Sequence, residues 1–194
     1  LRARIGRMRK IISLFARNYD GDRLVRDEVV PGAEWVVAGE GTATRKFDGT
    51  CAMVRDGILY KRYDAKKGKT PPPGFEPAQD YDEITGHMPG WIAVGDGPDD
   101  KWFREAFVDR SYLPNGTYEL CGPKVQGNPE GMYSHILIPH GDEHLPDAPR
   151  SFDAIREYLS SGAIEGIVWH HPYGRMVKIK AKDFGIKRAR AASG

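Results

Sequence analysis

Short β-rich segments, broken at close intervals by glycine and proline, constrain the fold of this chain most. The 194 residues include 23 Gly and 14 Pro, and both residue types interrupt regular structure. The segments between them are typical of strands: 34–38, 43–47, 51–54, 58–63, 117–121, 136–138, 164–169 and 176–181. One helix is predicted after the N-cap Ser151, with Phe152, Ile155 and Leu159 at helical spacing and Gly162 as its stop. This pattern predicts an α+β fold built on antiparallel sheets with a few flanking helices.

Composition narrows the class of protein. Hydrophobic residues make up 40% and charged residues 29%, which is ordinary for a globular chain. No apolar stretch is long enough to span a bilayer, so no membrane is expected as a partner. Two cysteines cannot form a disulfide framework, which indicates a reducing compartment and predicts a cytoplasmic protein. The length favours a single domain over residues 1–194, with flexible basic tails at 1–10 and 185–194.

The net charge of +2 is unevenly distributed, because basic residues crowd both ends. Basic ends favour a polyanionic partner, since neutralised phosphates release counterions. Solvated, fraying termini explain the same pattern equally well. Charge alone therefore does not choose between these readings.

The segment 44–50 (TRKFDGT) sets a lysine at the end of a predicted strand. Side chains alternate along a strand, so Thr44, Lys46 and Asp48 share one face and Arg45 the other. Asp-Gly at 48–49 predicts a turn. The lysine is then either an ordinary residue beside a hairpin turn or a nucleophile in a cleft. A second Asp-Gly turn at 56–57 predicts two successive hairpins, which would return Arg62 to the level of Lys46.

A second pair of segments, 165–169 and 176–180, predicts a hairpin closed by a Pro-Tyr-Gly turn. Lys178 and Lys180 share one face of its second strand, and neighbouring like charges repel unless anions lie nearby. They either point at water or, with Glu165 as ligand for a hard cation, form a site for phosphate and metal.

These motifs together resemble those of the covalent nucleotidyltransferases, which comprise DNA ligases, RNA ligases and mRNA capping enzymes. Lys46-Phe-Asp-Gly-Thr50 is similar to their KxDG motif, and Arg62 resembles the arginine that follows it. The later motifs resemble 118–122 (YELCG), 165–168 (EGIV) and 178–180 (KIK), in the family's order and across most of the chain.

Within that superfamily the chain most resembles RNA ligases. Thr50 after Asp-Gly is similar to the RNA-ligase version of the first motif. Only 14 residues follow Lys180, so no OB domain is expected, although a truncated chain would lack one too. The segments 119–129 and 138–141 resemble a compact subgroup that includes the vertebrate 5′-to-3′ RNA ligase and its bacterial and viral relatives.

The resemblance implies a function and a set of site residues. A free lysine, with a pKa of about 10.4, is protonated at pH 7, and burial with nearby cations favours the nucleophilic amine. Lys46 would then attack ATP, carry AMP as a lysyl adduct, and pass it to an RNA 5′-phosphate that a 3′-hydroxyl displaces, in RNA repair or processing by a monomer. The implied roles are Glu119 on the ribose, Arg62 orienting nucleotide and phosphate, Lys178 and Lys180 on the α-phosphate, Thr44 and Arg45 as further nucleotide contacts, and Glu165 in a Mg²⁺ or Mn²⁺ site.

Several alternatives stay open at this point. The adenine-stacking residue is not identified, since residues 136–138 are aliphatic with Tyr133, His135 and His140 at their borders. Zinc binding is set aside, because His140 and His144 lack a helix and the cysteines are expected in the core. The tryptophans are expected as core or loop-anchoring residues rather than base-stacking platforms, and Trp91 is the one to test for RNA contact. Rival functions are an mRNA guanylyltransferase, a DNA ligase fragment, and a non-catalytic RNA-binding module.

Overall fold

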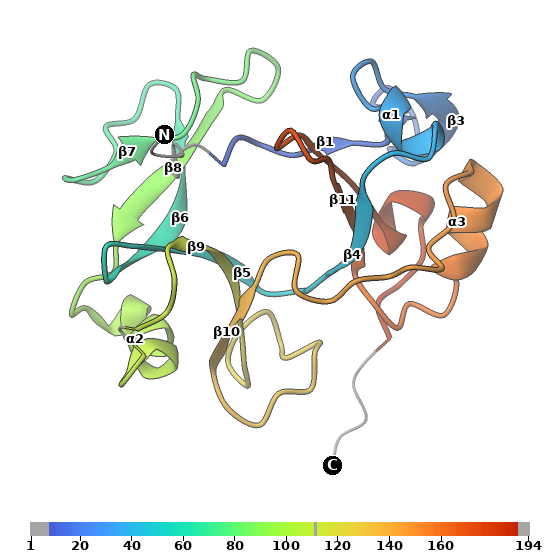
Figure 1. The fold of residues 1–194 in the computed structure, drawn as a ribbon. Helices are drawn as coiled ribbons and strands as arrows, with labels where there is room; N and C mark the ends of the chain where they lie inside the picture. The colour runs from blue at the N-terminus through green and yellow to red at the C-terminus, as the bar shows by residue number, and fades with distance from the viewer. Residues whose placement is uncertain (1–7, 111, 190–194) are drawn as a thin grey trace. The chain divides into compact units, whose positions relative to one another are not determined.

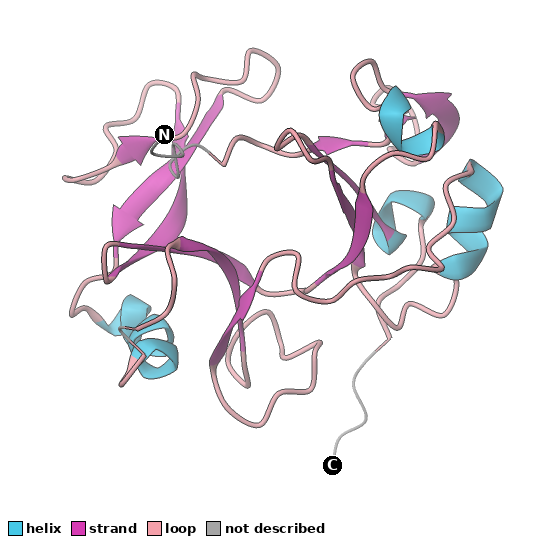
Figure 2. Ribbon diagram, viewed as in Figure 1, coloured by secondary structure: helices cyan, strands magenta, loops and turns pink. Residues whose placement is uncertain are grey.

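The computed structural model describes residues 8–110 and 112–189, which form a mixed α+β structure of many strands and few helices (Figures 1 and 2). This confirms the predicted fold class at that level. The described residues fall into two compact units. Among the described residues, unit 1 contains 8–10, 49–110 and 112–140, and unit 2 contains 11–48 and 141–189.

Unit 1 is built on a six-stranded antiparallel sheet in the order β10-β9-β5-β6-β8-β7. Its strands are β5 (Thr50–Arg55), β6 (Ile58–Lys66), β7 (Glu76–Pro77), β8 (His87–Ala93), β9 (Gly116–Cys121) and β10 (Ile136–Pro139). The 3-10 helix η1 (Pro98–Asp100) leads into α2 (Lys101–Phe107). A tight turn at Asp56-Gly57, in which both residues have positive φ, closes the β5–β6 hairpin.

The two faces of the unit 1 sheet differ in chemistry, because side chains alternate along each strand. One face packs a core that includes Ala106 of α2. The other holds Met53, Tyr60 and Trp91, with Cys51 packed against them. The first face carries the sheet residues Ala52, Val54, Leu59, Tyr118 and Leu120. The candidate site residues of unit 1, Arg62 and Glu119, therefore lie on the second face.

Unit 2 contains a four-stranded sheet in the order β1-β12-β11-β4, with a separate β2–β3 pair. Its elements are β1 (Ile12–Ser13), β2 (Phe15–Arg17), β3 (Val25–Val29), α1 (Glu34–Val37), β4 (Thr42–Lys46), α3 (Phe152–Tyr158), β11 (Gly166–His170), β12 (Met176–Lys180) and η2 (Ala181–Phe184). The pairing of β1 with β12 is parallel, and the other pairings of this unit are antiparallel. One sheet face is a closed core of Ile167, Trp169, Val177 and Ile179, covered by Ile155 of α3.

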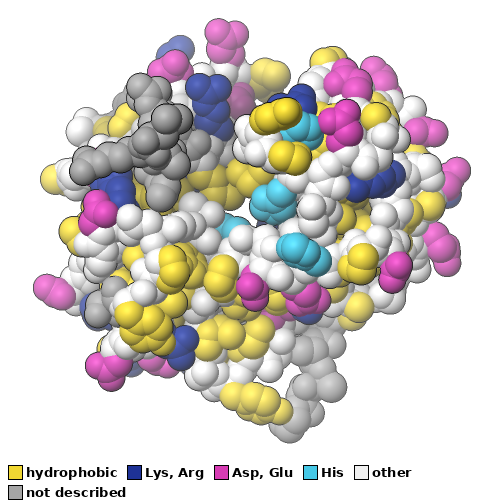
Figure 3. Space-filling view, viewed as in Figure 1, with side chains coloured by type: hydrophobic (Ala, Val, Ile, Leu, Met, Phe, Trp, Pro, Cys, Tyr) yellow, Lys and Arg dark blue, Asp and Glu magenta, His cyan; other side chains and the backbone are white. Residues whose placement is uncertain are grey.

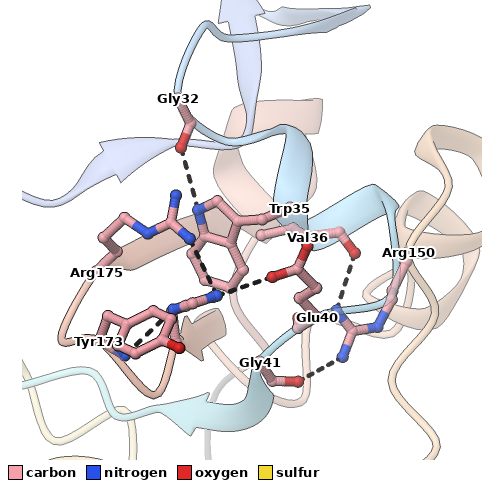
Figure 4. Close-up of polar contacts among 9 residues, drawn as sticks. Gly32, Trp35, Val36, Glu40, Gly41, Arg150, Tyr173 and Arg175 are labelled. Carbon is pink, nitrogen blue, oxygen red and sulfur yellow. Dashed lines mark hydrogen bonds and ion pairs between the residues drawn. The ribbon is translucent and has the colours of Figure 1, made fainter.

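A cluster of aromatic and charged side chains fixes the turn that joins β11 to β12 (Figure 4). Buried His171 contacts the Glu40 carboxylate at 2.8 Å through Nε2, and its Nδ1 accepts the Tyr173 backbone N–H at 3.2 Å. The His171 ring packs edge-on against Trp35 at 5.1 Å, and the guanidinium of Arg175 lies over the same indole. Nε2 also lies 3.0 Å from the Arg175 guanidinium, so the ring bridges Glu40, Arg175 and the backbone of Tyr173. The cluster ties the hairpin turn to the segment around α1 and so stabilises the register of β12.

Arg150 anchors the same segment from another direction. Its guanidinium donates to the backbone carbonyls of Val36, Glu40 and Gly41 at 2.5–2.9 Å (Figure 4). Val36 lies in the one-turn helix α1, and Glu40 and Gly41 follow it, where the end of the helix offers few backbone donors. A permanent cation satisfies them and holds the chain that leads into β4.

The structure corrects two sequence expectations. Residues 34–38 contain the one-turn helix α1 rather than a strand, and α1 buries both Trp35 and Val36. Two adjacent residues cannot both face one buried side of a strand, so burial overrides their β-propensity. The hairpin predicted at Asp48-Gly49 is also wrong, because β4 pairs with β11 while β5 pairs with β6 and β9. A Cβ on Gly49 would lie 2.2 Å from the Leu120 carbonyl oxygen. The chain before β5 can therefore approach β9 this closely only at a residue without a side chain.

The described parts of the basic ends make specific contacts. Lys10 donates its backbone N–H to Gln79 and pairs with Asp82 through Nζ. Arg188 donates to the carbonyls of Gly162 and Ala163. The basic residues within 1–7 and 190–194 lie outside the described residues. On the face drawn in Figure 3, acidic and basic side chains are scattered among hydrophobic ones. Within 8–110 and 112–189, no helix has the length and apolar character to cross a membrane.

The core of unit 2 predicts a large stability difference between two isoleucines. Ile179 is fully buried, whereas Ile84 is 89% exposed. Ile179→Ala should lower the free energy of unfolding by about 2–5 kcal/mol, since it leaves a cavity. Ile84→Ala should change it by less than about 0.5 kcal/mol. Urea denaturation measures both, and equal effects would contradict the assigned core.

Candidate functional site

In unit 2, backbone pairing brings Lys46 and Lys180 to the same row of the sheet. Both residues are register partners of Gly166, Lys46 from β4 and Lys180 from β12. Neighbouring strands lie about 4.8 Å apart, so the two Cα atoms are roughly 10 Å apart across Gly166. The central residue of the row has no side chain, which leaves the space above it to the two lysines. Lys178 lies in the next row on the same face, opposite Val168.

The amine of Lys46 forms an ion pair with Glu165, with Nζ 2.7 Å from Oε2. Both side chains are mostly buried. Burial raises the pKa of Glu165, and the charge of Asp48 adds to the rise, while Lys46 and Lys180 oppose it. The structure therefore brings together the predicted nucleophile and the predicted metal ligand.

The two lysines of β12 share this electrostatic environment. Burial first, and then the positive charges of Lys180 and Lys46, lower the pKa of Lys178 to about 8. Burial also lowers the pKa of Lys180, although Asp183 and Glu165 raise it. Three amines crowded on a desolvated surface favour an anion beside them, because an anion relieves both repulsion and desolvation. These three lysines with Glu165 form what we term the lysine cluster.

Carboxylates at the edge of the lysine cluster organise its backbone. Asp183 accepts the backbone N–H of Lys180 at 2.9 Å and forms an ion pair with Arg17. Asp48, just beyond β4, lies 3.7 Å from the guanidinium of Arg188. The C-terminal end of β12 and the segment after η2 are thus tied to the rest of unit 2.

Thr44 and Arg45 are engaged within unit 2. The Thr44 hydroxyl donates to the Val168 carbonyl at 3.0 Å and lies 3.1 Å from Nε2 of His170. Arg45 points to the opposite face from Lys46, pairs with Glu143 at 3.3 Å, and stacks over Phe47. Both contacts support β4, and the nucleotide contacts expected of these two residues stay predictions.

The other two expected nucleotide ligands, Arg62 and Glu119, belong to unit 1. Arg62 lies over the Trp91 indole at 4.9 Å and donates to the Met8 carbonyl at 2.7 Å. Burial lowers the pKa of Arg62. Glu119 is buried, accepts the Gly49 backbone N–H through Oε1 at 3.2 Å, and contacts Nε2 of His140 through Oε2 at 2.8 Å.

Glu119 also belongs to a group that sequence reasoning missed. Cys51, Glu119 and His140 each bring one potential metal-ligand atom to within 4.8 Å of the others. Cys51 and Glu119 are register partners on β5 and β9. These residues are far apart in sequence and form no spaced motif, so only the strand pairing could have revealed them.

The structure limits which aromatic side chains could stack on a nucleotide base. His135 is buried, stacks on Trp102 at 4.6 Å, and pairs with Glu105, so its ring is already covered. Trp91 is 1% exposed beneath Arg62, which confirms the expectation that it is a core residue rather than a platform for stacking a base. Tyr133, at 97% exposed, has an open ring.

Comparison with known proteins identifies the family. A family model described as RNA ligase 1 matches residues 96–192, half of the chain. The chain belongs to the RNA ligase 1 family. The matched segment contains Glu119, Glu165, Lys178 and Lys180, while Lys46 and Arg62 precede it.

The chain is similar to three vertebrate proteins named RNA ligase 1. It is 29% identical over 136 residues to that of Danio rerio, 29% over 160 residues to that of Pongo abelii, and 31% over 135 residues to that of Mus musculus. The alignments cover 52–61% of this chain and 41–49% of those proteins. The chain thus spans about half the length of the RNA ligase 1 relatives it matches.

Gly166 carries the first prediction for this site. A Cβ here would lie 2.1 Å from the Ile179 carbonyl oxygen, so Gly166→Ala must push β11 and β12 apart. We expect the free energy of unfolding to fall by at least about 1–3 kcal/mol. Gly97→Ala is the matched control, because a Cβ there meets nothing within 4 Å. Chemical denaturation of both variants tests this, and a neutral Gly166→Ala would contradict the close strand approach.

The lowered pKa of Lys178 predicts pH-dependent anion binding. Below its pKa of about 8 the Lys178 amine is protonated and attracts phosphate. Above that pH the neutral amine must take up a proton before it can attract the anion. The affinity for pyrophosphate should then fall by up to about tenfold per pH unit above 8. Lys178→Arg, which stays charged, should reduce this slope in calorimetric titrations. An unchanged slope would show that Lys178 does not face the anion.

Proposed function

We propose that this protein is an ATP-dependent RNA ligase in which Lys46 is the nucleophile. The observation that carries the proposal is the lysine cluster, in which the Lys46 amine lies 2.7 Å from Glu165 on the face that holds Lys178 and Lys180. The family match and the KxDG-like motif at 46–49 support it from the sequence. An ordinary surface lysine would instead point into solvent.

In the proposed reaction, the uncharged Lys46 amine attacks the α-phosphorus of ATP. A nitrogen–phosphorus bond forms, pyrophosphate leaves, and the amine proton passes to solvent. Lys178 and Lys180 neutralise the charge that develops on the α-phosphate oxygens. Their lowered pKa values fit this role, because the cluster gains most from an anion placed among its amines.

The amine of Lys46 needs to lose its proton before it reacts, and its carboxylate partner Glu165 favours the charged form. Glu165 and Asp48 fit a hard cation, since burial and the mutual repulsion of these carboxylates raise the pKa of Glu165. A bound Mg²⁺ or Mn²⁺ would supply positive charge that competes with the amine for Glu165. Released from that ion pair, Lys46 would lie beside two further cations and would be easier to deprotonate.

The remaining steps follow from the resemblance. AMP passes from Lys46 to an RNA 5′-phosphate, forming a phosphoanhydride and regenerating the amine. An RNA 3′-hydroxyl then attacks that 5′-phosphate, AMP leaves, and a phosphodiester is sealed. In unit 1, Glu119 would accept hydrogen bonds from the ribose hydroxyls and Arg62 would orient the nucleotide.

Intact-mass measurement tests the chemistry directly. With Mg²⁺ and ATP, the protein should gain the mass of one AMP, and Lys46→Ala should gain none. Lys67→Ala is the matched control, because Lys67 is exposed and should leave the adduct intact. A GMP adduct formed from GTP would instead indicate a capping enzyme, and no adduct at all would indicate a non-catalytic RNA-binding module.

Substrate choice is tested with the adenylated protein. Single-stranded RNA that carries a 5′-phosphate and a 3′-hydroxyl should be joined or circularised. A nicked DNA duplex should not be sealed at a comparable rate. The reverse preference would replace RNA ligase with DNA ligase and leave the role of Lys46 unchanged.

A further inference from the structure

A mixed group of metal-binding side chains lies on one face of the unit 1 sheet. The sulfur of Cys51, a carboxylate oxygen of Glu119 and a ring nitrogen of His140 lie within 4.8 Å of one another. Glu119 is buried and the other two are half-buried, so all three are partly shielded from water. Two ligands of one ion at coordination distances of about 2.0–2.3 Å lie no more than about 4.6 Å apart, so small side-chain rotations would bring all three onto one ion.

The backbone of unit 1 fixes the positions of these three residues. Cys51 and Glu119 are direct register partners in the antiparallel β5–β9 ladder, so their side chains leave the sheet on the same face. His140 follows β10 immediately, and its N–H donates to the Thr117 carbonyl at 3.1 Å. Ligands held by strand ladders lose little conformational freedom when an ion binds.

The Thr117 hydroxyl contacts the ring nitrogen of His140 that faces away from Glu119. Its hydroxyl lies 2.9 Å from Nδ1 of His140, while Nε2 contacts Glu119. A hydroxyl both donates and accepts. It can therefore donate to Nδ1 while Nε2 holds the proton, and accept from Nδ1 once Nε2 binds an ion. Metal-bound histidines almost always have such a partner on the second nitrogen.

We infer that Cys51, Glu119 and His140 bind a divalent cation of the zinc class. Thiolate, imidazole and carboxylate are the donors that Zn²⁺ takes, whereas Mg²⁺ prefers oxygen ligands alone. The thioether of Met8, 4.0 Å from the Cys51 sulfur, lines the same place with a soft group. On binding, the Cys51 thiol releases its proton to solvent, and the His140 proton moves from Nε2 to Nδ1 by exchange with water.

A cation here would also act on the proposed ligase reaction. Oε1 of Glu119 accepts the Gly49 backbone N–H, so the nucleotide ribose and the cation would both need Oε2. Zinc should therefore compete with ATP. This second step rests on the proposed function, whereas the binding site itself does not.

Cobalt titration of the whole chain tests the site without any activity. A Co²⁺–thiolate bond produces a charge-transfer absorption band, which we expect to appear with one equivalent and to disappear when Zn²⁺ is added. Cys51→Ala should abolish the band, and Cys121→Ala, at the other cysteine, should retain it. Thr117→Val should lower the affinity about 10- to 100-fold. Circular dichroism confirms that each variant is folded.

The absence of a band in the folded wild-type protein would overturn the site. Equal bands in the two cysteine variants would overturn it too. Thr117→Val guards against a Cys51→Ala variant that fails to fold, since it keeps all three ligands and changes only the hydroxyl. An affinity unchanged by Thr117→Val would contradict the geometry on which the site is argued.

Zinc inhibition of adenylation tests the link to the nucleotide. The zinc concentration that halves AMP transfer should rise with the ATP concentration, and Cys51→Ala should need more zinc than Cys121→Ala, each measured against its own zinc-free rate. Inhibition independent of ATP would overturn the competition. Failure of AMP transfer without zinc would reject the proposed function alone, because the cobalt band reports the metal site separately.

Discussion

The pairing of β11 with both β4 and β12 is the constraint on which unit 2 depends. It fixes Gly166 between Lys46 and Lys180, and the same strands bury Ile167, Trp169 and Ile179 on their other face. Because side chains alternate, an apolar core on one face forces the alternate residues onto the other. The hydrophobic effect that stabilises the sheet therefore also holds the amines together against their mutual repulsion.

The Lys46–Glu165 ion pair gives this arrangement a balance between two states of the proposed nucleophile. A charged amine beside a carboxylate is a stable but unreactive pair in a mostly buried setting. Lys178 and Lys180 act in the opposite direction, since each added cation favours a neutral amine. In the proposed reaction, the reactivity of Lys46 would then depend on what occupies Glu165. This places control of the amine on a neighbouring carboxylate rather than on burial alone.

Sequence patterns predicted most of the strands and the lysine cluster, because both depend on local alternation. Lys178 and Lys180 are two residues apart on one strand, and Glu165 directly precedes the partner strand. The turn signal at residues 170–175 predicts the hairpin that brings the three residues together. The helix α1 could not be predicted, since burial of Trp35 and Val36 depends on tertiary packing against His171 and the unit 2 core. The path of the chain after Asp48 could not be predicted either, because the pairing of β5 with β9 joins residues about seventy positions apart in the sequence. The group of Cys51, Glu119 and His140 is hidden for the same reason.

The two glutamates of the predicted motifs differ in their neighbours, and that difference separates two kinds of cation. Glu165 has amines around it and Asp48 nearby, so a cation there would find oxygen ligands and phosphate, which suits a hard ion such as Mg²⁺. Glu119 has an imidazole at 2.8 Å and a thiol on the register partner, which suits a borderline-soft ion such as Zn²⁺. Affinity alone would let zinc compete for either carboxylate. The donor atoms beside each glutamate therefore provide the discrimination, and a single replacement of Cys51 should remove it at Glu119 while leaving Glu165 unaffected.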